Sequence, residues 1–88
     1  MVRNTETIIA DLAQIVRYYN DVCANGHEAI TSVVENDDKR HSFEMRSDDN
    51  TFSAVITEKV AQYCSIYSIS YYFTVKDGDL VLRVYWRD

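Results

Sequence analysis

The sequence predicts a two-layer α+β sandwich in which two helices cover one face of a four-stranded antiparallel sheet. Two segments carry apolar residues at helical spacing, and two others alternate apolar and polar residues on either side of a turn. Their order along the chain is helix, hairpin, helix, hairpin. The 88 residues are 47% hydrophobic and 26% charged, which suits one globular domain and argues against intrinsic disorder.

Apolar residues at three- and four-residue spacing predict one amphipathic helix from residue 4 to residue 26. Asn4 or Thr5 can cap its first turn, and Asn25-Gly26 is a stop signal. The stripe that should face the core comprises Ile8, Leu12, Ile15, Tyr19 and Val22, widened by Ile9, Val16 and Cys23.

Residues 28–35 and 40–46 predict a first hairpin, with Asp37-Asp38 as a two-residue turn that pairs Glu35 with Arg40. Asp-Asp is a poorer turn pair than Asn-Gly, so a longer loop is an open alternative. The expected core face holds Ile30, Val34, His41, Phe43 and Met45. The opposite face holds Thr31, Val33, Ser42 and Glu44.

After a polar linker at residues 48–51, a second helix is expected, ending near Ser65 without a glycine to mark its end. Its stripe comprises Phe52, Val55, Ile56, Val60, Tyr63 and Cys64.

The last segment carries the strongest local signal, because Asp77-Gly78 separates two alternating runs and predicts a tight hairpin. Pairing outward from this turn gives one apolar face, expected at the centre of the core with Leu12, Ile15 and Ile56. That face comprises Ile69, Tyr71, Phe73, Val75, Leu80, Leu82, Val84 and Trp86. The opposite face pairs Thr74 with Val81, Tyr72 with Arg83, Ser70 with Tyr85 and Ser68 with Arg87.

The chain is thus expected to be a single domain, residues 1–88, that can be divided into two helix–hairpin halves at residues 4–47 and 48–88. The two turn centres lie about 40 residues apart, which is typical of a duplicated unit. The order of the strands across the sheet does not follow from the sequence.

The net charge of −5, from nine basic and fourteen acidic residues, excludes a generally basic nucleic-acid coat and disfavours an anionic membrane. The first residues are too polar for a signal peptide, and no apolar run approaches the ~20 residues of a membrane span. An intracellular, cytoplasmic location is expected. Cys23 and Cys64 are interpreted as reduced and mostly buried thiols.

No catalytic, metal or cofactor site is predicted. Phosphate loops and nucleophile elbows need glycines at fixed positions, and Gly26 and Gly78 are both assigned to a helix end and a turn. The two histidines lack the spacing of zinc ligands. We expect His27 to serve in a cap or linker and His41 to be a hydrogen-bonded core residue.

Binding residues are predicted on the face of the second hairpin that the helices leave open. Tyr72, Arg83, Tyr85 and Arg87 have the composition of an interface hot spot, although a solvated face with a Tyr72–Arg83 contact is about equally favoured. A second, acidic surface that could meet a basic partner is expected at Glu35, Asp37, Asp38, Glu44, Asp48 and Asp49.

These features favour a small, acidic, non-catalytic protein-interaction module that forms a homodimer through its open sheet face. Its size and charge also fit an inhibitor of a basic or nucleic-acid-binding partner, of the kind that phages encode against host defences. The alternative is a nucleic-acid or nucleotide binder that stacks bases on the same tyrosines. The net charge of −5 disfavours this alternative.

Overall fold

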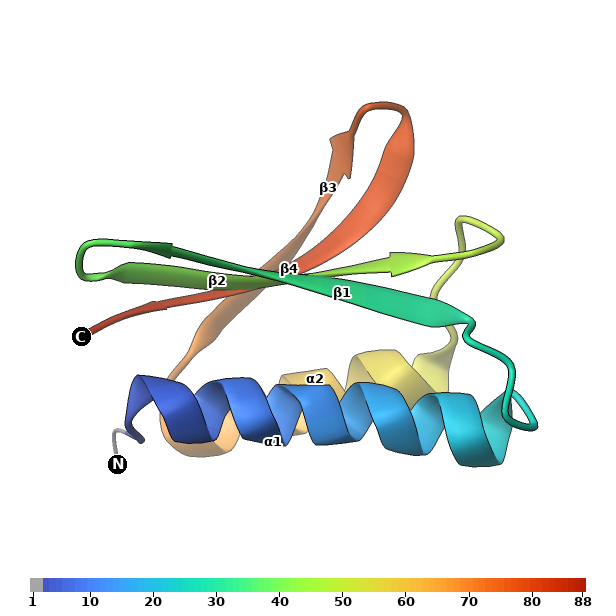
Figure 1. Cartoon of the computed structure of the whole chain (residues 1–88), viewed down its shortest axis with the longest axis horizontal. Helices are drawn as coiled ribbons and strands as arrows, with labels where there is room; N and C mark the ends of the chain where they lie inside the picture. Colours follow the sequence, from blue (N-terminus) through green and yellow to red (C-terminus); the bar gives the residue numbers. More distant parts are fainter. Residues whose placement is uncertain (1–2) are drawn as a thin grey trace.

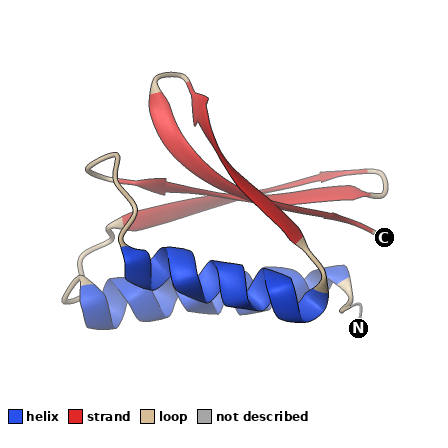
Figure 2. Cartoon of the chain, turned by 180° about the vertical axis from the view of Figure 1, so that it is seen from behind, coloured by secondary structure: helices blue, strands red, loops and turns tan. Residues whose placement is uncertain are grey.

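The computed structural model describes residues 3–88 as two helices beneath one antiparallel sheet (Figures 1 and 2), which confirms the predicted fold class. The sheet order is β1-β2-β4-β3, so each helix–hairpin half supplies one edge strand and one central strand. The elements are α1 (Thr5–Tyr18), a π-helical turn η1 (Tyr19–Cys23), β1 (Ile30–Asp37), β2 (Arg40–Ser47), α2 (Ala54–Tyr67), β3 (Ser70–Lys76) and β4 (Asp79–Arg87). None of the helices described between residues 3 and 88 is long and apolar enough to span a membrane.

The core lies between the two helices and the two central strands, because only β2 and β4 are covered by the helix layer along most of their length. Each large side chain that is fully buried there contributes roughly 1.5–3 kcal/mol. The helices supply Ile8, Leu12, Val16, Ile56, Val60 and Cys64, and the central strands supply Phe43, Met45, Leu82, Val84 and Trp86.

The first helix ends its regular α-helical part earlier than predicted. After Tyr18 the chain widens into η1, and the Asn20 side chain then pairs with both backbone groups of Ile30 at 2.9 and 3.0 Å, where β1 begins. Val22 and Cys23 turn to solvent as a result, so the expected burial of Cys23 is wrong. The helical spacing could not reveal this, because the π-turn inserts an extra residue in the repeat.

The two thiols should therefore react at very different rates. Cys64 is buried beneath the sheet, and its burial raises the pKa of the thiol to about 11, whereas Cys23 is exposed. Only a thiolate reacts readily with a disulfide reagent. We expect Ellman's reagent at pH 8 to modify one thiol in the native protein and both in urea. Rapid modification of both thiols without urea would contradict this burial.

The first hairpin forms with its turn displaced by one residue. Asp38-Lys39, and not Asp37-Asp38, is the two-residue turn, with Asp38 at φ 55°, so Asp37 pairs with Arg40 and Glu35 with Ser42. Each strand residue consequently meets a partner two positions away from the predicted one. A shift by two keeps every side chain on its predicted face, because strand side chains alternate with a period of two.

The second hairpin has the predicted register from Ser70↔Tyr85 to Lys76↔Asp79. The pairs predicted beyond it do not form, because Ser68 adopts a left-handed conformation (φ 56°) that ends α2 two residues later than expected. Ile69 then donates its N–H to the carbonyl of Cys64 at 2.9 Å, and its side chain packs against the core from outside the strand.

One half of the predicted core face is not buried. Tyr71 and Phe73 were expected at the centre of the core, but they are 40% and 42% exposed. Their strand, β3, is an edge strand that reaches past the helix layer, and the ring of Phe73 packs edge-on against Phe52 at 5.5 Å between centroids. The core prediction holds for β4 and is wrong for β3.

A candidate binding groove on the open sheet face

The open face of the sheet is concave. Lys76, at the end of edge strand β3, places its Nζ 3.2 Å from Oε1 of Glu44 on β2 and 3.9 Å from Oε1 of Glu35 on β1. β3 and β1 are opposite edges of the sheet, so these contacts require the second hairpin to curl across the open face. Figure 2 shows the tip of this hairpin rising away from the helix layer.

The curl buries part of the face that was expected to be bare. Ser42, Glu44 and Val81 point to the open side, yet they are only 2%, 5% and 0% exposed. The Glu44 carboxylate also lies 3.6 Å from Nη1 of Arg83, so two cations compensate one buried anion. Glu44 is therefore an internal ion-pair partner, and its assignment to an acidic docking surface is wrong.

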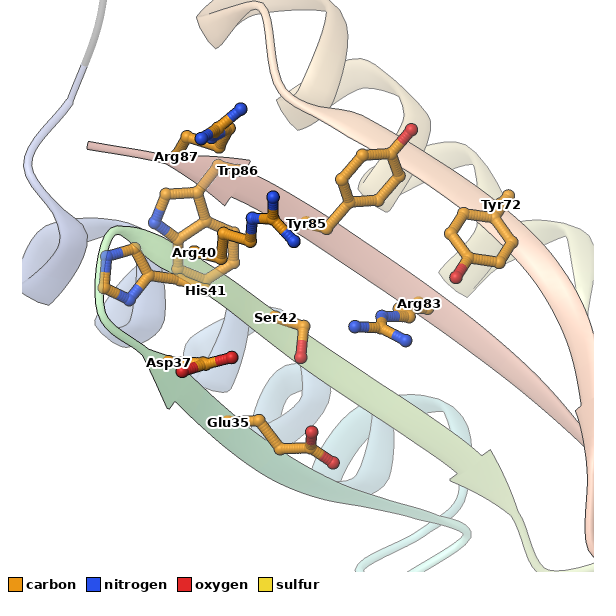
Figure 3. Close-up of a pocket in the computed structure, with 10 residues that line it drawn as sticks. All are labelled: Glu35, Asp37, Arg40, His41, Ser42, Tyr72, Arg83, Tyr85, Trp86 and Arg87. Atoms are coloured by element: carbon orange, nitrogen blue, oxygen red, sulfur yellow. The ribbon is translucent and has the colours of Figure 1, made fainter.

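The rest of the open face forms a pocket of about 540 Å³, lined by residues of all four strands (Figure 3). All four of the residues predicted for binding line it: Tyr72 on β3 and Arg83, Tyr85 and Arg87 on β4. Tyr72 and Tyr85 hold each other edge-to-face at 5.4 Å between ring centroids, and both remain about two-fifths exposed. This geometry fixes two large, partly exposed rings in the pocket.

The strand order adds a fifth binding position, and a third cation, that the sequence did not indicate. Arg40 of β2 is the direct cross-strand partner of Arg87 of β4, and both line the pocket. Within residues 3–88, neither guanidinium has a carboxylate within 4.0 Å, although Asp37 is the neighbour of Arg40 on β1. Like charges directly opposite each other repel, so this pair favours an added anion.

A buried hydroxyl lies beside these arginines. Ser42 is flanked across the strands by Glu35 and Tyr85, and its Oγ has no hydrogen-bond partner within the described residues, 3–88. Nε of Arg83, in the same wall, also lacks one. Buried polar groups are normally hydrogen-bonded, so these two atoms are exceptions in the pocket wall, and both are closed off from solvent.

The predicted acidic residues do not form one surface. Glu35, Asp37 and Asp38 lie near the first turn, and the first two line the pocket. Asp48 and Asp49 lie at the other end of β2, in the loop before α2.

The two aspartates of that loop have local partners. Asp48 contacts Nε2 of His27 at 2.6 Å, joining two loops, which agrees with a linker role for this histidine. Asp49 accepts hydrogen bonds from the hydroxyls of Ser47 and Thr51, which lower the pKa of its carboxyl.

His41 also lines the pocket, and its ring is held by a set of structural contacts. Its Nδ1 is 2.6 Å from Oδ1 of Asn36, its Nε2 is 2.9 Å from Oδ1 of Asp88, and its ring stacks on Trp86 at 5.8 Å. These contacts use both ring nitrogens. Among residues 3–88, no three His, Cys, Asp or Glu side chains cluster as a metal site would require.

Fold and site together define a small α+β domain with a mixed-charge, tyrosine-lined groove on its open sheet face. Comparison of the chain with known protein families, curated proteins and solved structures gave no significant match.

Proposed function

We propose that the chain is a non-catalytic protein-binding module whose open-face groove holds a segment of a partner protein bearing an acidic side chain. The observation that carries this proposal is the Arg40–Arg87 pair, which has no carboxylate partner among residues 3–88 and lies in the same groove as Tyr72 and Tyr85. Arginine and tyrosine are the residue types enriched at the energetic centres of protein interfaces.

The chemistry of the groove suits a carboxylate on a polypeptide. A guanidinium binds a carboxylate through two parallel N–H···O bonds, and two adjacent guanidiniums can share one anion. The rings of Tyr72 and Tyr85 supply an apolar surface for the neighbouring residues of the bound segment.

The acidic residues of the groove favour a polypeptide over nucleic acid. Glu35 and Asp37 line the same pocket as the arginines, and the whole chain carries a charge of −5. A phosphate backbone would meet these carboxylates at every register, whereas a peptide of mixed charge can pair with both signs. Binding of single-stranded nucleic acid on the two tyrosines is the second candidate.

The concave shape of the open face favours a foreign segment over a second copy of this chain. Two identical concave faces related by a two-fold axis touch at their rims and leave their centres unfilled, and interface centres carry most of the binding energy. Inhibition of a basic or nucleic-acid-binding protein, which the size and charge suggest, would require that protein to present an acidic segment to the groove.

Selection of random short peptides displayed on phage against the immobilised protein tests this proposal. We expect enriched peptides to contain Asp or Glu, and their affinity to fall at least about tenfold, or ~1.4 kcal/mol, in both Arg87→Gln and Arg40→Gln. Arg17→Gln on α1, outside the groove, is the matched control and should bind normally. Equal losses in all three variants, or enrichment of peptides without acidic residues, would overturn the proposal.

A parallel titration with oligothymidylate addresses the second candidate. We expect no binding at physiological salt. Saturable binding that weakens steeply with salt and is lost in Arg87→Gln would assign the groove to nucleic acid instead.

A further inference from the structure

The edge strand β3 exposes an apolar row on its helix side. Tyr71, Phe73 and Val75 are 40%, 42% and 69% exposed, and they follow one another on the same face. Proteins normally protect such edges with charges, proline or a bulge. The charged residue of this strand, Lys76, turns to the open side, where it contacts Glu44.

The opposite edge of the sheet, strand β1, carries charged side chains. β1 ends in Glu35, Asn36 and Asp37, so two carboxylates protect the half of that edge nearest the turn. Within residues 3–88, the sheet has two edge strands, β1 and β3, and only β3 lacks charged side chains along its exposed row.

The free backbone groups of β3 belong to the same three residues. In a two-residue hairpin the residues flanking the turn form a hydrogen-bonded pair, and hydrogen-bonded and non-hydrogen-bonded pairs then alternate. Lys76↔Asp79 flanks the turn, so Tyr71, Phe73 and Val75 direct their N–H and C=O groups away from β4. The apolar row and the unpaired backbone therefore coincide.

We propose that two copies of this chain associate through β3, forming one antiparallel eight-stranded sheet with a two-fold axis at Phe73. Phe73 is the central residue of the strand Ser70–Lys76. Antiparallel pairing about it places Phe73 opposite Phe73 of the second copy and Tyr71 opposite Val75 of the second copy. These are the residues with free backbone groups, so the hydrogen-bonding pattern continues across the axis without a shift.

The charges are compatible with this pairing. Across the axis Lys76 meets Ser70 of the second copy, and Tyr72 meets Thr74, so no like charges oppose each other. A two-fold axis perpendicular to the sheet also keeps both helix layers on one side and both open-face grooves on the other. The dimer therefore leaves the groove assigned to the partner protein uncovered, and of the residues that line this groove only Tyr72 lies on the paired strand.

The helix layer leaves room for the second copy. Lys59 and Tyr63 contact α1 through Tyr18 and Asp11, which fixes the side of α2 that faces its neighbour. The opposite side of α2 carries the small side chains of Ala54, Thr57 and Ala61. The exposed rings of β3 from the second copy can approach this flank closely.

The surface area that the dimer would bury indicates the affinity to expect. A seven-residue edge with these three side chains would bury on the order of 500 Å² on each copy, which is at the low end of specific interfaces. We therefore expect a dissociation constant in the micromolar range and a protein that is monomeric when dilute.

Sedimentation equilibrium over a wide range of concentration tests the dimer. The apparent mass of the wild-type protein should rise from 10.2 kDa toward twice that value. Val75→Lys places one charge on each copy beside the axis and should raise the dissociation constant at least tenfold. Val33→Lys is the matched control, because Val33 is a similarly exposed valine (57%) on the other edge strand, and it should dimerise normally.

Amide hydrogen exchange gives a readout that does not depend on a variant. The N–H groups of Tyr71, Phe73 and Val75 should exchange rapidly in dilute protein and become protected as the concentration rises. A monomer at near-millimolar concentration would overturn the proposal. So would a dimer that Val75→Lys leaves intact, or one that Arg87→Gln dissociates, since the latter would place the interface on the open face.

Discussion

Replacing Trp86 with alanine should lower the free energy of unfolding by about 3–5 kcal/mol, the usual cost of removing a large buried aromatic side chain. The indole is 8% exposed, stacks on His41 and donates from Nε1 to the hydroxyl of Thr5 at 3.2 Å. The substitution thus removes contacts between β4, β2 and α1 together. Urea denaturation followed by circular dichroism measures the loss, which is a large fraction of the 5–15 kcal/mol typical of a domain.

Phe73→Ala is the matched comparison, because the sequence predicts the same core face for both residues. Phe73 is 42% exposed and packs edge-on against Phe52, so we expect a loss of only about 1–2 kcal/mol. Both variants should be measured at a protein concentration well below the dissociation constant of the proposed dimer, so that the unfolding of the monomer is compared. Equal losses would show that β3 is buried as fully as β4, contrary to the structure.

Replacing Lys76 with methionine should cost about 1–3 kcal/mol and open the curl of the second hairpin. The Glu44 carboxylate, with its side chain 6% exposed, would keep Arg83 at 3.6 Å as its remaining cation. Leaving a buried charge short of its partner commonly costs 3–5 kcal/mol, and we lower this figure because Lys76 itself is about half exposed. Urea denaturation measures the cost.

A double-mutant cycle isolates the ion pair from the loss of the lysine stem. We expect Lys76→Met combined with Glu44→Gln to be at least about 1 kcal/mol more stable than the sum of the single losses predicts. Lys39→Met, at an exposed turn position, is the control and should stay within about 0.5 kcal/mol of wild type. Additive losses in the cycle would mean that Lys76 and Glu44 do not stabilise one another.

The open-face groove depends on the same ion pair. Lys76 is what joins the two edges of the sheet across the face, and the groove walls come from all four strands. If Lys76→Met flattens the sheet, the affinity of peptides selected on the wild-type protein should fall without any change at Arg40 or Arg87. Such a loss would show that the curl of the second hairpin supports the proposed binding at this face.

The sequence by itself determined those features that depend on neighbouring residues. Asp77 and Gly78 adopt φ values of 54° and 84°, which only a few residue types tolerate. The identities of these two residues therefore predict the turn and the register of the second hairpin. The first turn was mispredicted because Asp37, Asp38 and Lys39 offer no comparable preference. The two faces of the first hairpin were still predicted correctly, because a register shift of two residues leaves every side chain on the same face.

Tertiary structure alone decided which residues of the two hairpins meet. The β2–β4 pairing brings Arg40 against Arg87, and nothing local to either segment specifies it. The same pairing makes β3 an edge strand, which leaves Tyr71 and Phe73 exposed despite a pattern identical to that of a buried strand. The curl that buries Glu44 also has no local signal. These features arise when two amphipathic halves bury their apolar faces against each other, because contacts distant in sequence, and not turn chemistry, then set strand order and curvature.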